Sequence, residues 1–168
     1  MLNFRQFEAG PDPFGRKFQV MFKWLQTAIS IRHSDTIDVK FVLVDENGPT
    51  PKPIIGFFSL NLCQIKSEAL TADEAKKLPR DLSGIRLGRL AVAKAYQRQG
   101  IGKALLVAAM GKFMEIFSAA AGIGLFVDAK DQKAKRYYEQ FGFVALPSNE
   151  LELFLPVKTI QNALTPHS

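Results

Sequence analysis

The stretch YQRQGIGKALL, from Tyr96 to Leu106, decides the fold of this chain. A strand-like apolar run, IRLGRLAV (85–92), precedes it, and a helix-like run, ALLVAAMGKFMEIF (104–117), follows it. Gly100 and Gly102 lie between the two, flanked by basic residues. A helix that starts directly after such a loop presents unpaired N–H groups and a positive dipole end, which favour an anion. The pattern therefore predicts a strand–loop–helix unit that binds a phosphate-bearing ligand.

Two well-known nucleotide loops do not match these residues. A Walker loop needs GxxxxGK[ST], and this chain has neither that spacing nor a hydroxyl residue after Lys103. A dinucleotide loop needs GxGxxG, and here Leu105 would block the close approach of helix and strand at the third position. The pattern that is met is Q-x-x-G-x-G, with Gln97, Gly100 and Gly102. Its glycines let successive N–H groups turn toward one anion, and a pyrophosphate fits such a loop.

The composition is that of a globular protein with one core. The chain has 168 residues, of which 47% are hydrophobic and 23% are charged. No apolar run reaches the length of a membrane span, and the N-terminus has no signal-peptide pattern. A single cysteine, Cys63, and two distant histidines, His33 and His167, provide neither a disulfide framework nor a Cys/His metal cluster. These features predict a cytoplasmic protein with no membrane segment and no structural metal.

The positive charge is concentrated in the second half of the chain. The formal net charge is +6, and residues 85–168 carry 11 basic and 6 acidic side chains. This excess suits a polyanionic ligand. The charge count alone, however, favours a cationic face that is simply solvated, so a polyanion needs support from a motif.

The remaining patterns predict an α+β domain that spans residues 1–168. Strands are expected at 4–8, 39–44, 54–62, 85–92, 123–129, 143–146 and 151–155. Helices are expected at 16–31, in a short segment after Thr71, at 101–117 and at 131–140. An antiparallel hairpin followed by the order β-α-β-α-β-β indicates one domain with a mixed sheet.

Two blocks carry a resemblance to a known family. LGRLAVAKAYQRQGIGKALL (87–106) resembles the central motif of the GCN5-related N-acetyltransferases, the GNAT family. DQKAKRYYEQFGF (131–143) resembles the C-terminal motif of that family, which Ala134, Tyr138 and the pair Gly142–Phe143 match. Asp131 stands where the family more often has Asn. The resemblance implies the GNAT fold, with a central mixed, mostly antiparallel sheet flanked by helices, and acetyl-CoA as the cofactor.

The resemblance also implies roles for individual residues. Main-chain groups of Leu90, Ala91 and Val92 would pair with the pantetheine arm of acetyl-CoA, and Asp131 would contact the same arm. Tyr138 would be the general acid, since a phenol with a pKa of about 10 stays protonated at neutral pH and can protonate a leaving thiolate. The pyrophosphate would lie on the loop residues Gln97, Arg98, Gln99, Gly100, Ile101, Gly102, Lys103 and Ala104.

The general base is not identified by the sequence. Tyr137 should point about 100° away from Tyr138 on a helix, so it is expected to pack with Ala134 and Phe141 rather than face the thioester. The central strand carries no carboxylate, so Asp128 and Asp131 are the candidates for the base. A site poor in carboxylates favours an α-amine, with a pKa near 8, over a lysine side chain, with a pKa of about 10.4.

A narrower resemblance concerns the acceptor. The segments RLGRLAV, FVDAKD, YYEQFGF and LFLP together resemble the acetyltransferase toxins of bacterial toxin–antitoxin pairs. That resemblance implies acetylation of the α-amine of aminoacyl-tRNA, a block of translation and a small DNA-binding antitoxin as partner. Dimers are common in the family, so a homodimer is a further expectation. The candidate tRNA contacts are Arg86, Arg89, Lys94, Lys133 and Arg136.

Two alternatives remain open at this point. One is an ordinary acetyltransferase that acts on a small amine or a protein N-terminus, without any dependence on tRNA. The other is a binding module that keeps the pocket for the coenzyme but has lost the chemistry. A tyrosine at the position of the general acid argues against the second.

Overall fold

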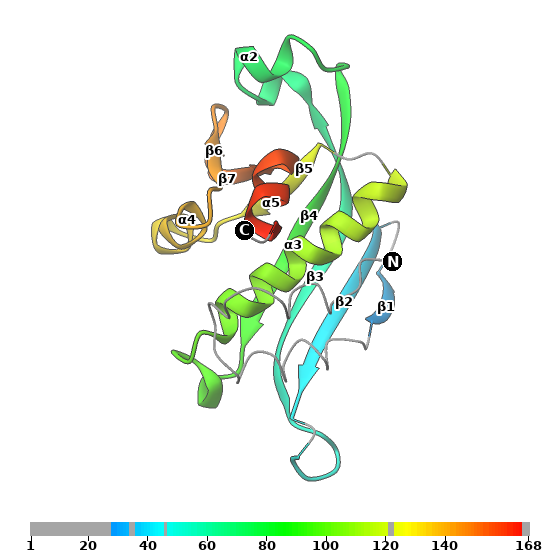
Figure 1. Cartoon of the computed structure of the whole chain (residues 1–168), viewed down its shortest axis with the longest axis vertical. Coiled ribbons are helices and arrows are strands. Elements are labelled where there is room, and N and C mark those ends of the chain that lie inside the picture. The colour runs from blue at the N-terminus through cyan, green and yellow to red at the C-terminus, as the bar shows by residue number, and fades with distance from the viewer. Residues whose placement is uncertain (1–27, 34–35, 46, 121–122, 166–168) are drawn as a thin grey trace.

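The computed structural model describes residues 28–33, 36–45, 47–120 and 123–165 of the chain (Figure 1). The strands are β1 (Ala28–His33), β2 (Thr36–Val44), β3 (Ile54–Lys66), β4 (Asp81–Val92), β5 (Gly124–Asp128), β6 (Val144–Leu146) and β7 (Asn149–Pro156). They form one sheet in the order β1-β2-β3-β4-β5-β7-β6. All neighbouring strands are antiparallel except β4 and β5, which are parallel. The predicted α+β fold with a mixed, mostly antiparallel sheet is confirmed.

The helices are α2 (Ala72–Ala75), α3 (Ile101–Ala120), α4 (Gln132–Glu139) and α5 (Val157–Leu164). In Figure 1, α3 lies diagonally across β3 and β4, and α5 lies near β5 and β7. Short α2 lies at the far end of the long hairpin that β3 and β4 form. Within the described segments, no helix is both long enough and apolar enough to span a bilayer.

The main core lies between α3 and the sheet. On the helix, the fully buried side chains include Leu105, Leu106 and Phe113. On the strands, Phe58 is fully buried and Leu87 nearly so. Each such side chain stabilises the fold by about 1.5–3 kcal/mol through removal of apolar surface from water. This burial explains why a helix with so few charged residues forms here, because nearly every turn of it contacts the core.

Gly56 on β3 lets α3 approach the sheet closely. A Cβ at this position would lie 2.7 Å from the carbonyl oxygen of Ala91 and 2.8 Å from a methyl group of Leu105. Both distances are too short for a real contact, so only glycine fits without movement of the helix. The close approach fixes the start of α3 beside the end of β4, where the glycine loop lies.

The structure corrects two expectations about elements. The helix expected at 16–31 is wrong over residues 28–31, which belong to β1 and pair with β2 from Ala28–Phe41 to His33–Thr36. The rest of that helix, the strand expected at 4–8 and His167 lie outside the described residues. Helix α5 was not expected, although Ile160 is fully buried on it and anchors it to the core.

Candidate active site

A cleft opens where β4 and β5 separate. Their parallel pairing covers Ile85–Leu87 of β4 and Leu125–Val127 of β5. Beyond Leu87, β4 continues along β3 as far as the pair Val92–Gly56, but within the described chain no strand pairs with its other edge. The backbone groups on that edge therefore face open space, and the cleft beside them has a volume of about 720 Å³.

A bulge in β4 marks the point of separation. Ser59 of β3 pairs with Arg89, and the next residue, Leu60, pairs with Leu87, so Gly88 is an extra residue in β4. A bulge bends its strand and leaves the extra residue unpaired. A Cβ on Gly88 would lie 3.0 Å from the Ser59 hydroxyl oxygen, which explains the glycine at this tight position. The bulge thus turns the end of β4 away from β5 and widens the cleft.

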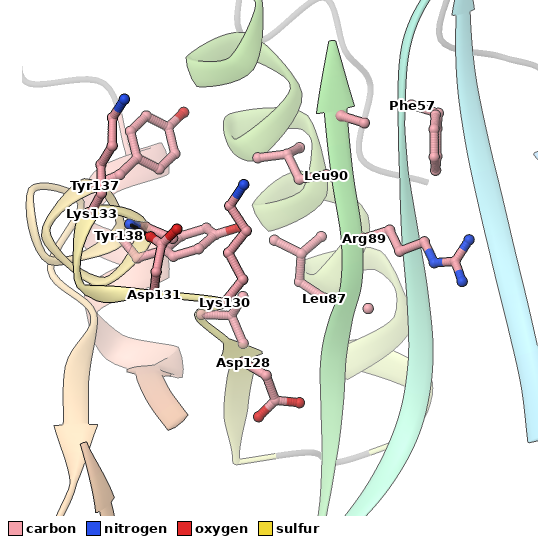
Figure 2. A pocket seen from close by; sticks show the side chains of 14 residues that line it. Phe57, Leu87, Arg89, Leu90, Asp128, Lys130, Asp131, Lys133, Tyr137 and Tyr138 are labelled. Atoms are coloured by element: carbon pink, nitrogen blue, oxygen red, sulfur yellow. Dashed lines mark hydrogen bonds between the residues drawn. The ribbon is translucent and has the colours of Figure 1, made fainter. Parts of the chain in front are cut away.

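Figure 2 shows the two walls of the cleft. Leu87 and Leu90 project into it from β4, and Tyr137 and Tyr138 project from α4 on the other side. Lys130, from the segment between β5 and α4, extends into the space between these walls. Of the residues predicted from the sequence, the cleft brings together Arg89, Leu90, Ala91, Asp128, Asp131, Lys133 and Tyr138, but not Val92.

The predicted glycine loop lies at the end of β4 and leads directly into α3. Arg98 has a φ of 59° and Gly100 a φ of 80°, so the chain makes a tight left-handed bend before Ile101. The side-chain amide of Gln97 donates to the carbonyl oxygen of Val92 at 2.9 Å, which ties the loop to the strand. The first N–H groups of a helix have no partner within the helix, so they are available to an anion.

The structure corrects the predicted contact of Ala104 with the pyrophosphate. Its N–H donates to the carbonyl oxygen of Gly100 at 3.1 Å, and its side chain is fully buried. The helical ladder has already begun at this residue, so Ala104 has no group left to contact a ligand. The predicted anion contacts that remain after this correction are Gln97, Arg98, Gln99, Gly100, Ile101, Gly102 and Lys103.

Tyr138 lies in the cleft with its ring packed edge-on against Phe143, at a centroid distance of 5.5 Å. Burial raises the pKa of the Tyr138 phenol above its ordinary value. A proton is therefore held on this oxygen at neutral pH. A half-buried, protonated hydroxyl at the side of an open cleft is suited to donate a proton to a leaving group.

The surroundings of Tyr137 agree only in part with those that the helical spacing predicts. Its ring packs edge-on against Phe141 at 5.2 Å and against Tyr138 at 5.4 Å, so the expected contact with Phe141 is present. The ring also lines the cleft, which the spacing argument did not anticipate. Burial, and to a smaller degree the neighbouring Tyr138, raises the pKa of Tyr137 to about 12.

Asp131 caps α4. Its carboxylate Oδ1 accepts a hydrogen bond from the N–H of Ala134 at 2.8 Å, which satisfies one of the unpaired donors at the helix start. The side chain remains exposed at the rim of the cleft. An Asp serves this capping role as well as the Asn that the family more often has.

The structure corrects the predicted role of Arg86 as a tRNA contact. Its guanidinium bonds Asp128 at 2.5 Å and Glu152 at 2.7 Å, and its side chain is 22% exposed. Burial alone would lower the pKa of Arg86, but hydrogen bonds and charge attraction from the two carboxylates outweigh it and raise the pKa. Arg86 therefore links β4, β5 and β7 rather than facing a phosphate, and the same contact engages Asp128, one of the two candidate bases.

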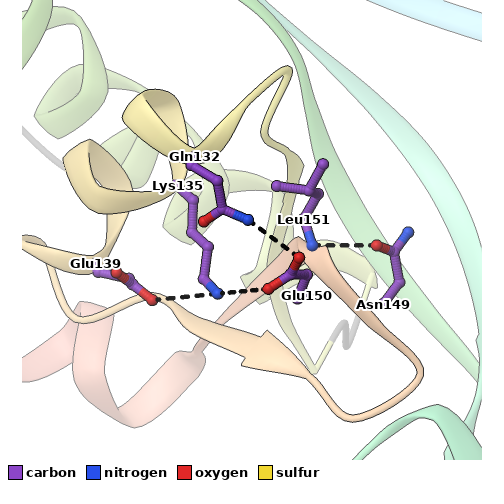
Figure 3. Close-up of polar contacts among 6 residues, drawn as sticks. All are labelled: Gln132, Lys135, Glu139, Asn149, Glu150 and Leu151. Carbon is purple, nitrogen blue, oxygen red and sulfur yellow. Dashed lines mark hydrogen bonds and ion pairs between the residues drawn. The ribbon is translucent and has the colours of Figure 1, made fainter.

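A second polar network holds α4 against the hairpin of β6 and β7 (Figure 3). Glu150 accepts from Gln132 at 3.0 Å and lies 3.5 Å from the ammonium nitrogen of Lys135. Lys135 also reaches Glu139 at 4.0 Å, and its side chain is 17% exposed. This network fixes the helix that carries the two tyrosines.

The other basic residues predicted for tRNA are placed differently. Lys94 lies in the exposed turn after β4, and Arg136 is exposed on α4. Arg89 and Lys133 line the cleft. Within the part of the chain that the structure describes, no cluster of His, Cys, Asp and Glu could hold a metal.

Among the polar side chains that line the cleft, sequence reasoning missed Lys130 and Tyr137. Lys130 enters the cleft because it directly precedes the cap of α4, and its place just after a predicted strand was the available signal. Tyr137 was assigned to the core from the geometry of one helix alone.

The model of the acetyltransferase (GNAT) domain matches residues 39–145. A tRNA-acetylating toxin of Mycobacterium tuberculosis (strain ATCC 25618 / H37Rv) is 31% identical over 108 residues, which are 62% of this chain and 63% of that protein. The matched region thus spans less than two thirds of that relative's length.

Two solved structures are similar in fold and sequence. AtaT complexed with acetyl-methionyl-tRNAfMet has a TM-score of 0.70 and 30% identity, over 76% of each chain. AtaTR bound with acetyl-CoA has a TM-score of 0.65 and 30% identity, over 76% of this chain and 75% of the other.

Proposed function

Because this chain belongs to the GNAT acetyltransferase family, we propose that it transfers the acetyl group of acetyl-CoA to the α-amine of an aminoacyl-tRNA and so blocks translation. The observation that carries this proposal is that the open strand edge joins the loop before α3 to the cleft that Tyr138 lines. The open edge of β4 leads at one end into the left-handed loop before α3, and Tyr138 lies across the cleft from the same strand.

The residues of the cleft fit acetyl-CoA. An extended arm can pair with the open backbone edge at Leu90 and Ala91 and with the N–H of Val92, whose carbonyl oxygen already accepts from Gln97. A diphosphate can be held by the N–H groups at the start of α3, with Arg98 beside them. A buried hydroxyl on Tyr137 also lacks a partner among the described residues. When bound, acetyl-CoA supplies an activated acetyl thioester.

Tyr138 is the proposed proton donor. Its raised pKa keeps the phenol protonated over the neutral range, and its hydroxyl points across the cleft toward β4 (Figure 2). The backbone groups near Leu90 are suited to orient and polarise the carbonyl of the acetyl group. As the amine nitrogen bonds the acetyl carbon and the carbon–sulfur bond breaks, the phenol would give its proton to the leaving sulfur, and the proton lost by the amine would restore the phenol.

The acceptor amine is inferred from the carboxylates of the cleft. Asp128 pairs with Arg86, and Asp131 caps α4, so both carboxylates that line the cleft within the described residues are engaged. Because no carboxylate among the described residues of the cleft is free to deprotonate the acceptor, the site suits an amine that is already partly neutral. An α-amine, with a pKa near 8, meets this condition far better than a lysine side chain.

The tRNA is proposed to contact the basic residues around the cleft, namely Arg89, Lys94, Lys133 and Arg136. The similarity to a tRNA-acetylating toxin and to AtaT supports this acceptor. We further propose that residues 1–168 act as one catalytic domain in the cytoplasm. A small DNA-binding antitoxin is the proposed partner, and a homodimer the proposed assembly.

The test is acetyl transfer from isotope-labelled acetyl-CoA to total charged tRNA, with the acetyl group located by mass spectrometry. The proposal predicts label on the α-amine of the esterified amino acid and none on uncharged tRNA. Label on free small amines or protein N-termini at comparable rates would assign the chain to ordinary acetyltransferases. Binding of acetyl-CoA without any transfer would make it a binding module.

A further inference from the structure

The Tyr137 hydroxyl is buried, and no described residue offers it a hydrogen bond. A buried phenol usually finds a partner, because an unsatisfied hydroxyl costs about 1–3 kcal/mol. The ring itself is well packed against Tyr138 and Phe141. Packing therefore explains a phenyl ring at this position but not its oxygen atom.

The position of the hydroxyl indicates what it meets. It lies 3.4 Å from the point where a Cβ on Gly102 would stand, and a methyl group of Val92 lies 3.9 Å from the same point. Val92 is the last residue of β4, and Gly102 is in the first turn of α3. Gly102 has no side chain, so only main-chain atoms of that residue can lie against the oxygen. The hydroxyl thus faces the junction between the open strand edge and the start of the helix.

The chemistry of this junction selects a partner for the hydroxyl. The raised pKa of Tyr137 keeps the phenol protonated at neutral pH, so the oxygen can donate a hydrogen bond. The positive end of α3 nearby favours a partner with negative charge or a strong carbonyl dipole. Acetyl-CoA carries both kinds of acceptor, phosphate oxygens in its diphosphate and amide oxygens in its pantetheine arm.

We propose that the Tyr137 hydroxyl donates a hydrogen bond to an acceptor oxygen of acetyl-CoA, where the pantetheine arm meets the diphosphate. This inference rests on the proposed function and deepens it. The two adjacent tyrosines then have separate tasks, because Tyr137 holds the cofactor and Tyr138 supplies the proton. Tyr137 acts in binding and has no part in the proton transfer.

The experiment measures dissociation constants by calorimetry for acetyl-CoA and for acetyl-pantetheine, which lacks the diphosphate. The variants are Tyr137→Phe and, as the matched loss of one hydroxyl on the same wall, Tyr138→Phe. Tyr137→Phe should raise the Kd of acetyl-CoA by roughly 3- to 30-fold. Tyr138→Phe should leave that Kd within about twofold. A loss of affinity for both ligands places the acceptor on the arm, and a loss for acetyl-CoA alone places it on the diphosphate.

Thermal unfolding without ligand separates a binding role from a structural one. Tyr137→Phe should leave the Tm of the free protein unchanged or raise it, because it removes an unsatisfied buried group. The rise in Tm on addition of acetyl-CoA should be smaller than in the wild type. A variant that is less stable without ligand and equally stabilised by it would show that the hydroxyl has only a structural role.

The failures of the two proposals are distinguishable. A wild-type protein that does not bind acetyl-CoA removes the proposed function and this inference with it. A wild type that binds, together with a Tyr137→Phe variant whose Kd is within about twofold of it, overturns this inference alone. An equal loss of affinity in both variants would also overturn it, since the effect would not belong to Tyr137.

Discussion

The start of α3 and the α4 wall of the cleft contribute different kinds of groups, main-chain groups in the first and side-chain groups in the second. At the start of α3, the main chain forms the site through the left-handed bend at Arg98 and Gly100. On α4, side chains form it through the hydroxyls of Tyr137 and Tyr138. A bend of the backbone can hold an anion but cannot give up a proton at a chosen atom, whereas a phenol can. Substitutions in the two regions should therefore separate binding from turnover.

The largest effect is expected for Tyr138→Phe. Loss of the proton donor should lower kcat by about 100-fold or more, with the Kd of acetyl-CoA unchanged. The raised pKa keeps Tyr138 protonated, so this residue should cause no decline in the wild-type rate between about pH 7 and 9. Steady-state kinetics with charged tRNA checks both points. A variant with an unchanged kcat would remove Tyr138 from the mechanism.

Gly100→Ala tests the other side of the comparison. Gly100 has a φ of 80°, and an L side chain there costs about 1–2 kcal/mol or distorts the loop. The Kd of acetyl-CoA should rise about tenfold, while kcat at saturation stays within about twofold. Gly111→Ala is the matched control, because a Cβ there meets nothing within 4 Å and should leave binding intact. Equal Kd values for wild type and Gly100→Ala would show that the bend is not needed.

Arg86→Gln tests whether Arg86 stabilises the fold through its ion pairs or contacts tRNA, as the sequence predicts. Loss of the guanidinium leaves Asp128 and Glu152 without their cation, so the free energy of unfolding should fall by about 1–2 kcal/mol. We discount the larger values known for fully buried pairs because the Asp128 side chain is 61% exposed. Urea unfolding measures the change, with exposed Arg89→Gln as control. Unchanged stability together with weaker tRNA binding would restore the original prediction.

The smallest effect is expected for Lys133→Gln and Arg136→Gln. Each should weaken tRNA binding by about threefold and reduce the slope of log Kd against log salt by about 0.7–0.9. Lys135→Gln is the control, because Lys135 is engaged by Glu150 and Glu139 and should leave the slope unchanged. Binding titrations at several salt concentrations give the slopes. The same slope in all three variants and the wild type would place the tRNA elsewhere.

The start of α3 was predictable because its determinants lie within a few consecutive residues. The spacing of Gln97, Gly100 and Gly102 fixes the bend, and the apolar run after it fixes the helix. The separation of β4 from β5 was not predicted, since the bulge at Gly88 depends on pairing with β3.

The errors concern contacts between distant parts of the chain. Arg86 and Glu152 are 66 residues apart, so no local pattern showed that this arginine was already paired. Residues 28–31 fit a helical stripe by spacing, but pairing with β2 decides for a strand. Helix α5 could have been found, because Val157, Ile160 and Leu164 recur at helical spacing directly after Pro156.

The most direct test of the main-chain site is amide NMR on protein labelled with ¹⁵N-glycine. Gly100 and Gly102 report on the bend, and Gly111 reports on the same helix further along. The account predicts large shifts of the Gly100 and Gly102 amides on addition of coenzyme A, a small shift at Gly111, and much smaller shifts at the first two with pantetheine. Shifts at other glycines with none at Gly100 and Gly102 would contradict it.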